Sequence, residues 1–426
     1  MRHKSVWLRL SLFSFIGLLV LVLGGLPIVG SADTGQRASE HWLGTWATSP
    51  SPPDLSGPSV AGFNDQTLRE IVYTHFGGKR VRVRLTNVFG AAPMTFGQVD
   101  IALRGPGASI VAGSDRTLTF DGSTSVTVPA DAEAYSDPVG LTVRAGQELA
   151  VSIFLPSPTG PTTWHSFADT TSYIASGNQA SDATGRAYTS TTNHWFLLDG
   201  VDVAGSSSDN AVVTLGDSIT DGTASTLDAN NRWPDFLARR LNSREENHTS
   251  VLDEGIGGNR VLNNAPCCGV NALARLDRDV LSQDGVRFVT LLEGINDIGF
   301  SQLTGPETAP QTDVSADQII AGYKQIIAQV HLKGLKIYGA TLTPFKGARY
   351  ETPAGLVKRG TVNNFIRNSG AFDAVIDFDK ATRDPNDPEM FLPAYDSGDH
   401  LHPNDAGYQA MANAIPLQLF RSSGED

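Results

Sequence analysis

Four short groups of residues in the second half of the sequence have side chains suited to acyl transfer. The first three are Gly-Asp-Ser at 216–218, a glycine-rich stretch at 255–258, and Gly-Ile-Asn-Asp at 294–297. The fourth is Asp-His-Leu-His-Pro at 399–403, which supplies a carboxylate and two imidazoles. A serine hydroxyl becomes a good nucleophile only when an oriented base removes its proton. These residue types therefore predict a hydrolytic centre built around a serine.

The spacing within the fourth group assigns the base and its orienting acid. Asp399 and His402 are three residues apart, a separation that suits a turn joining carboxylate and ring. His400 is the alternative base. Because it directly follows Asp399, however, little chain lies between the two residues to bend the carboxylate onto the ring. We therefore expect Ser218 to be the nucleophile, His402 the base and Asp399 the acid.

The second and third groups supply hydrogen-bond donors for an oxyanion. Glycines let backbone N–H groups approach a substrate oxygen, and Asn296 can add its side-chain amide. The predicted oxyanion hole consists of the backbone N–H groups of Ser218 and Gly258 and the amide of Asn296. Gly257 is the alternative to Gly258 as a donor.

The helices and strands that must position these groups follow the sequence pattern of an α/β domain. Buried strands are predicted at 211–215, 250–253, 288–292, 336–342 and 374–378, and helices at 233–241, 271–281, 316–332, 356–367 and 405–420. Ser315 and Gln318 have the spacing of a capping box, and Gly334 follows the end of the same helix. Five strands alternating with helices predict a parallel sheet covered on both faces, with reactive groups at the carboxyl ends of the strands.

The first half of the sequence predicts an antiparallel β-sandwich without helices. Strands are expected at 67–76, 79–85, 116–120, 125–128, 141–143 and 149–154. In the second of these, Arg80, Arg82 and Arg84 alternate with apolar residues, which predicts a solvated arginine face. A surface for an acidic polymer is the alternative for that face. With a linker at 205–208, we expect an accessory domain at 41–205 and a catalytic domain at 209–421.

The N-terminal residues 1–32 have the composition of a secretory signal peptide. Three positive charges precede a 14-residue uncharged stretch at 10–23, and small residues follow at 30–32. The mature protein is therefore expected to be secreted and to have no stable membrane contact. An uncleaved membrane anchor is the alternative, because the uncharged run can be extended to residue 30.

Composition and charge exclude several classes of function. The 426 residues carry a net charge of −13 and no basic run, so nucleic acid is not an expected partner. No dinucleotide or phosphate-binding fingerprint occurs, and we expect no cofactor and no metal. A zinc site remains the alternative for one group of side chains, which comprises Asp396, Asp399, His400 and His402.

The two cysteines, Cys267 and Cys268, are adjacent in the loop after the second group. A secreted protein meets an oxidising compartment, where neighbouring thiols tend to be oxidised. We therefore expect a vicinal disulfide, although its short Cα separation would strain it. Two free thiols are the alternative.

The ordered set of four groups resembles the SGNH hydrolase superfamily, also called GDSL-type esterases and lipases. The resemblance implies a flavodoxin-like three-layer domain and the same roles for Ser218, Gly258, Asn296, Asp399 and His402. Trp-Leu-Gly-Thr-Trp at 42–46 and the segments 68–71 and 80–87 are similar to the β domain of a secreted bacterial branch, often grouped with acetylxylan esterases.

That branch implies hydrolysis of short acyl esters, such as O-acetyl groups on xylan or another polysaccharide. A lipase or arylesterase is one alternative. A carbohydrate-binding protein without activity is the other, although every expected catalytic position is filled.

Overall fold

The computed structural model of the protein describes residues 40–244 and 247–421. The chain from Glu40 onward forms one compact unit. The predicted signal peptide at 1–32 lies outside the described residues, so its cleavage stays a prediction. Within those residues, no helix combines the length and apolar character needed to cross a membrane.

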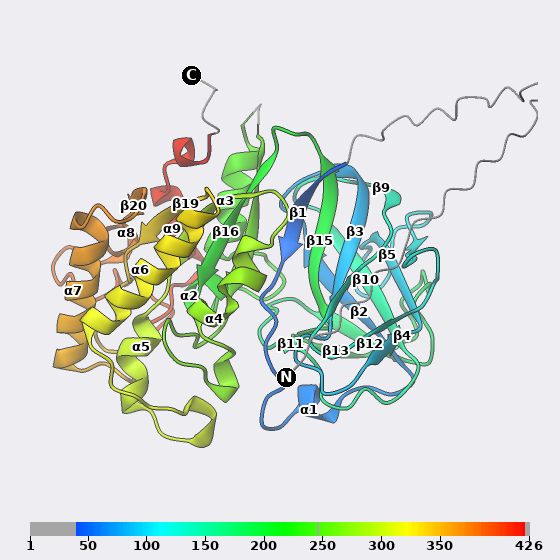
Figure 1. Ribbon diagram of the computed structural model, residues 1–426, viewed down its shortest axis with the longest axis horizontal. Helices are drawn as coiled ribbons and strands as arrows, with labels where there is room; N and C mark the ends of the chain where they lie inside the picture. The colour runs from blue at the N-terminus through cyan, green and yellow to red at the C-terminus, as the bar shows by residue number, and fades with distance from the viewer. Residues whose placement is uncertain (1–39, 245–246, 422–426) are drawn as a thin grey trace, which may run out of the picture. The chain divides into compact units, whose positions relative to one another are not determined.

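Two antiparallel sheets make up the first half of the described chain (Figure 1). The first contains β1 (His41–Ala47), β15 (Leu198–Gly205), β3 (Gly78–Thr86), β8 (Glu133–Tyr135) and β9 (Val139–Val143). The second contains β13 (Tyr188–Thr192), β12 (Ser172–Ser176), β2 (Gln66–Tyr73), β10 (Glu148–Leu155), β5 (Gln98–Leu103) and β6 (Arg116–Thr117). Two short ladders join β4 (Met94–Phe96) to β7 (Val126–Val128) and β11 (Trp164–His165) to β14 (Trp195–Phe196). The predicted antiparallel architecture is confirmed.

Strand β3 shows the expected period of two, but its arginine face is only partly solvated. Val81, Val83 and Leu85 are fully buried, as predicted. Arg84 is only 5% exposed and donates to Asp199 Oδ1 at 2.8 Å. Arg82 donates to Asp202 of β15 and to Asp284 of the second half of the chain. The predicted solvated face was wrong for Arg82 and Arg84, which acidic side chains of both halves cover, whereas the side chain of Arg80 is 43% exposed.

Other predictions for this half need smaller corrections. The strand predicted at 67–76 ends at Tyr73, because the chain bends at residues 75 and 76, where the His75 N–H donates to the Thr45 carbonyl of β1 at 2.8 Å. The strand predicted at 116–120 is cut to β6, because Phe120 forms a turn with Ser123. A short helix, α1 (Pro58–Ala61), occurs where none was expected.

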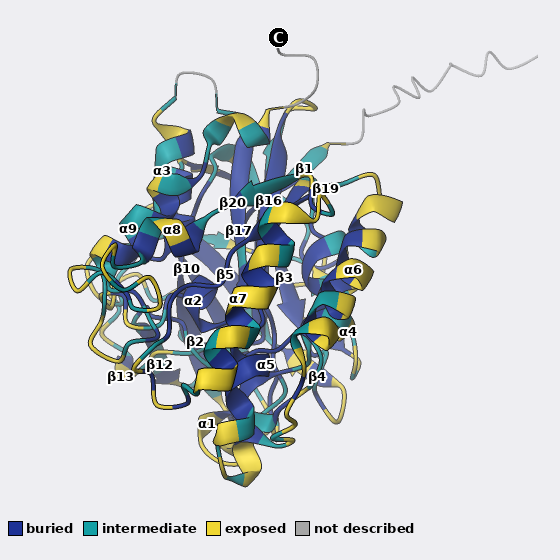
Figure 2. Ribbon diagram, turned by 90° about the vertical axis from the view of Figure 1, so that its left-hand side faces the viewer, coloured by how far each residue is buried: buried dark blue, intermediate teal, exposed yellow. Residues whose placement is uncertain are grey.

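A five-stranded parallel sheet forms the centre of the second half. Its strands are β16 (Asn210–Gly216), β17 (Thr249–Gly255), β18 (Val286–Leu292), β19 (Lys336–Ala340) and β20 (Ala374–Ile376). Their spatial order is β17-β16-β18-β19-β20, which is the flavodoxin-like order with the reversal at β16. Every residue of β16 is buried, as a central parallel strand requires (Figure 2). The predicted fold class is confirmed.

Helices cover both faces of this sheet. They are α2 (Ser218–Asp221), α3 (Trp233–Asn242), α4 (Ala272–Leu276), α5 (Ile295–Gly299), α6 (Ala316–Leu332), α7 (Pro353–Asn368), α8 (Phe378–Thr382) and α9 (Asp405–Ala414). Helices α4, α6 and α7 pack side by side, while α3, α8 and α9 form a separate group (Figure 1). The capping box of Ser315 and Gln318 is present at the start of α6.

Two helix predictions are corrected. The helix expected at 405–420 ends at Ala414, because Pro416 cannot continue it, and a short 3₁₀ turn, Leu417–Phe420, follows. The helix expected at 271–281 is α4 followed by a π-helical turn, Asp277–Leu281.

The two halves are joined by a turn and by direct contacts. Ser206 and Asp209 close the turn, with the Asp209 N–H donating to the Ser206 carbonyl at 3.0 Å. Strand β1 lies beside β17, and the Gly44 N–H donates to the Asp284 carbonyl at 3.1 Å. One hydrophobic cluster runs through both halves. The predicted division into domains at 41–205 and 209–421 stays a prediction.

Candidate active site

Ser218 lies at the carboxyl end of the central strand β16, as the sequence predicted. It is the first residue of the four-residue helix α2, and Asp217 caps this helix by accepting from the Ile219 N–H at 3.0 Å. Gly216 is required at the turn, because a Cβ there would meet the Leu292 carbonyl and the Thr220 side chain. The tight turn directs the Ser218 hydroxyl toward the loop before α9.

A continuous hydrogen-bond chain joins Ser218, His402 and Asp399. The Ser218 Oγ lies 2.8 Å from His402 Nε2, and His402 Nδ1 lies 2.6 Å from Asp399 Oδ2. Because a carboxylate only accepts, Nδ1 carries the ring proton and leaves Nε2 free to accept from the serine. This arrangement can remove the proton of the Ser218 hydroxyl and later return it.

Asp399 is held in its charged form by the same loop. Its Oδ1 accepts from the backbone N–H groups of Leu401 and His402 at 2.9 and 2.8 Å. Burial by itself raises the pKa of Asp399, but the hydrogen bonds and charge of His402 and the Leu401 N–H lower it well below its ordinary value. The carboxylate therefore stays ionised through neutral and mildly acidic pH.

His400 belongs to a different pair. Its Nδ1 lies 2.6 Å from Asp396 Oδ2, and its side chain is 44% exposed, against 12% for His402. The four side chains of the zinc alternative thus form two separate histidine–aspartate pairs. Among residues 40–244 and 247–421, no group of three or more His, Cys, Asp or Glu side chains could hold a metal ion.

The glycine-rich loop after β17 presents Gly258, not Gly257, as an available donor. The Gly257 N–H donates to Asp221 Oδ2 at 3.0 Å, whereas the Gly258 N–H has no acceptor in the described part of the chain. Gly258 has a φ of +74°, and a Cβ there would collide with Cys268 Sγ. Position 258 therefore requires glycine for both conformation and space.

The side-chain amide of Asn296 is fixed by two neighbours. Its Nδ2 donates to the Asn259 carbonyl at 3.0 Å, and its Oδ1 accepts from the Tyr350 hydroxyl at 3.1 Å. This leaves the second N–H of Nδ2 without a partner among the described residues. Asn296 lines the same pocket as Ser218, Gly258 and His402, so all the predicted site residues meet in one place.

The pocket has a volume of about 580 Å³ and is formed by the second half of the chain alone. Besides the predicted residues, it is lined by Thr223, Gly257, Cys267, Cys268, Phe300, Glu307, Thr308, Arg349, Tyr350 and Leu401. Cys267 and Cys268 form the expected vicinal disulfide, which belongs to the pocket wall beside Gly258.

Buried charges that the sequence analysis missed support the floor of the site. Arg275 is fully buried and donates to the carbonyl oxygens of Gly216 and Glu254, the ends of β16 and β17, at 2.9 and 2.8 Å. It also donates to Ser49 Oγ from the first half of the chain at 2.7 Å. No local motif marks Arg275, because its partners are distant in sequence.

Replacing Asn296 with alanine is expected to lower kcat by about 10²- to 10³-fold, the cost of losing one oxyanion donor. The change in KM is expected to be small, because the amide meets charge that develops only in the transition state. Steady-state kinetics with a short-chain ester measures both constants. Asn364→Ala, on the exposed face of α7, is the matched control. An effect on KM alone would contradict the assigned role.

The fold and the site together define a carboxylic ester hydrolase. Residues 214–410 match the model of the GDSL-like Lipase/Acylhydrolase family. The match includes all the predicted site residues.

Solved structures similar to this chain were also found. A carbohydrate acetylesterase family member from Sinorhizobium meliloti is 15% identical, with a TM-score of 0.39, over 49% of this chain and 97% of that chain. A catalytic mutant of an acetylxylan esterase from Geobacillus stearothermophilus is 21% identical, with a TM-score of 0.39, over 50% and 96%. A GDSL-like lipase from Bacteroides thetaiotaomicron is 17% identical, with a TM-score of 0.37, over 49% and 87%. No curated protein matches the chain.

Proposed function

We propose that the protein is a serine esterase in which Ser218 attacks the ester carbonyl and His402 acts as general base, oriented by Asp399. The observation that carries this proposal is the hydrogen-bond chain from Ser218 Oγ through His402 to Asp399. The Ser218 oxygen forms a bond to the carbonyl carbon while its proton moves to His402 Nε2. The same proton then leaves with the alcohol, and a water molecule repeats the sequence to release the acid.

The charge on the tetrahedral oxygen is proposed to be stabilised by Ser218 N–H, Gly258 N–H and Asn296 Nδ2. Two of these donors, at Gly258 and Asn296, have a hydrogen without a partner in the described residues, and the neighbouring structure fixes both in place. Preorganised donors of this kind contribute most to acyl transfer when they need not reorient during the reaction.

The preferred substrates are proposed to be short acyl esters of a hydroxyl-rich alcohol, such as O-acetyl groups on xylan or a related polysaccharide. The pocket has charged and hydrogen-bonding groups on its lining, including Glu307, Thr308 and Arg349. Seven large apolar side chains are exposed in the described residues, namely Leu55, Val60, Val111, Tyr135, Leu227, Leu332 and Val357. None of these seven side chains lines the pocket.

Secretion forms part of this proposal, because residues 1–32 have the features of a signal peptide and a polysaccharide substrate lies outside the cell. A lipase acting on long-chain esters is the second candidate, since the family description includes both lipases and acylhydrolases.

The substrate proposal is tested by kcat/KM across esters of increasing acyl length, together with acetate release from acetylated xylan. Acetyl and other short acyl esters are expected to react much faster than esters of twelve or more carbons. Each assay is run with and without EDTA, and full activity is expected with EDTA; activity that is lost with EDTA would favour the zinc alternative. A rate that rises with chain length, with no acetate released, would favour the lipase.

A further inference from the structure

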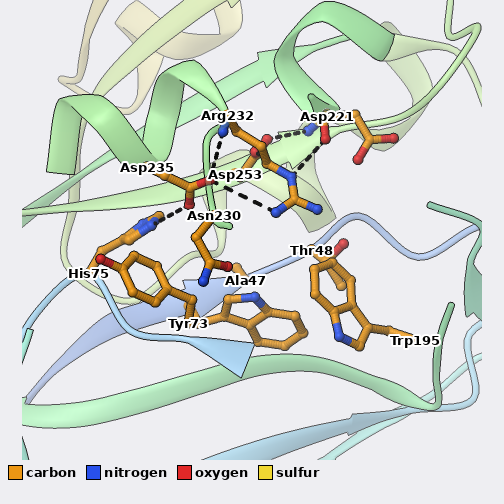
Figure 3. A pocket seen from close by; sticks show the side chains of 12 residues that line it. Ala47, Thr48, Tyr73, His75, Trp195, Asp221, Asn230, Arg232, Asp235 and Asp253 are labelled. Atoms are coloured by element: carbon orange, nitrogen blue, oxygen red, sulfur yellow. Dashed lines mark hydrogen bonds and ion pairs between the residues drawn. The ribbon is translucent and has the colours of Figure 1, made fainter. Parts of the chain in front are cut away.

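The loop that carries Gly258 is hydrogen-bonded to the side chain of Asp221, the last residue of helix α2. One carboxylate oxygen, Oδ2, accepts from the Gly257 N–H at 3.0 Å. The backbone carbonyl of the same residue accepts from Arg232 Nε at 2.7 Å, and Figure 3 shows Arg232 beside it among buried polar side chains. Asp221 therefore links the helix that begins with Ser218 to the loop that presents the Gly258 N–H.

The other oxygen of Asp221 is occupied by a residue from the first half of the chain. His165 of β11 places Nε2 3.1 Å from Asp221 Oδ1. The same nitrogen lies 3.1 Å from the Phe167 carbonyl, and Nδ1 lies 2.9 Å from the Ser49 carbonyl. All three partners are acceptors, so both ring nitrogens must carry protons and the ring is an imidazolium.

The pair is enclosed by protein on all sides. His165 and Asp221 are each 3% exposed. Burial alone lowers the pKa of His165, but the charge and hydrogen bond of Asp221, with the Ser49 carbonyl, raise it on balance. An enclosed ion pair stabilises a fold weakly, because desolvation offsets most of the attraction. Its position directly beneath the oxyanion loop suggests a role in the reaction.

We propose that His165 is a positioning residue, which acts through Asp221 to hold the Gly257–Gly258 segment so that the Gly258 N–H meets the oxyanion. This inference rests on the proposed esterase function. The β-rich half would then help to position an oxyanion donor, although it contributes no residue to the pocket lining.

The test measures kcat and KM of full-length His165→Ala on a short-chain ester, with kcat expressed per Ser218 titrated by a fluorophosphonate. Misplacement of one oxyanion donor is expected to lower kcat by about 10- to 100-fold while KM stays within about threefold. A purely structural role would lower the titrated fraction or the melting temperature and leave kcat per site unchanged. His165→Gln keeps the volume and one donor, and it is expected to retain more of kcat.

His194→Gln is the matched control, because His194 lies in the same region but bonds to the Ser166 carbonyl and not to Asp221. Asp221→Ala removes the acceptor of the Gly257 N–H and is expected to lower kcat at least as far as His165→Ala. The double variant is expected to be no worse than Asp221→Ala alone, because both changes act on one segment. If His165→Ala does not fold, the two single variants and the double variant are made instead with His165→Gln and Asp221→Asn.

Two results would overturn the proposal. One is a kcat per titrated site within about twofold of the unsubstituted protein in His165→Ala, and the other is a strictly additive loss in the double variant. Ser218→Ala is assayed in parallel on the same ester. If that change leaves the activity intact, the proposed esterase function fails. If Ser218→Ala abolishes activity but the histidine variant does not change kcat, only the positioning role fails.

Discussion

Replacing Ser218 with alanine is expected to lower kcat by about six orders of magnitude, the scale seen when a triad nucleophile is removed. The reason is that, among the described residues, Ser218 has the only hydroxyl hydrogen-bonded to His402 Nε2, at 2.8 Å. Hydrolysis of a short-chain ester, followed over hours, measures the residual rate. The loss is expected in kcat, because the pocket that binds the ester remains.

Labelling supplies the control for this experiment. A fluorophosphonate is expected to form a stable adduct with the unsubstituted protein at Ser218, located by mass spectrometry of the peptides. The Ser218→Ala protein is expected to remain unlabelled while its circular dichroism is unchanged. A label on another serine, or a variant that keeps its activity, would show that the nucleophile lies elsewhere.

Replacing His402 with alanine is expected to lower kcat nearly as far as the loss of Ser218, because residues that act as one unit give similar losses when removed singly. His400→Ala is the matched control, since its ring is paired with Asp396 and more exposed. That variant is expected to remain within about tenfold of the original rate, as a change outside the reacting groups.

Steady-state kinetics of both histidine variants decides the assignment. A severe loss in His400→Ala with a mild loss in His402→Ala would reverse it. Equal mild losses in both would leave Ser218 without a base and would contradict the esterase mechanism.

The residues at the strand ends could be predicted because each lies in a short motif that follows a buried apolar run. Gly216, Ser218 and Asn296 illustrate this, since the strands β16 and β18 end where the sequence indicated. The parallel sheet with helices on both faces followed from the alternation of strands and helices, whereas the flavodoxin-like arrangement was implied only by the family resemblance. The choice of His402 over His400 depended on the length of chain between acid and base.

The missed features depend on contacts between residues far apart in the chain. Alternation along β3 indicates which side chains share a face, but it does not reveal that Asp199 and Asp284 cover the arginines. The same holds for His165, which is 56 residues from Asp221. The early end of α9 had a local signal in Pro416 and could have been predicted.

The guanidinium of Arg275 connects the two halves of the chain, which matters for gene recombination and for protein engineering. It bonds to the ends of two central strands and, at the same time, to Ser49 in the β-rich half. A gene fragment that encodes only 209–421 would remove this partner and would expose a charged cluster that folding normally encloses. The two halves are therefore expected to remain together when genes recombine. Replacing the β-rich half with an unrelated domain would require new partners for the Arg275 side chain at the contact between the two halves.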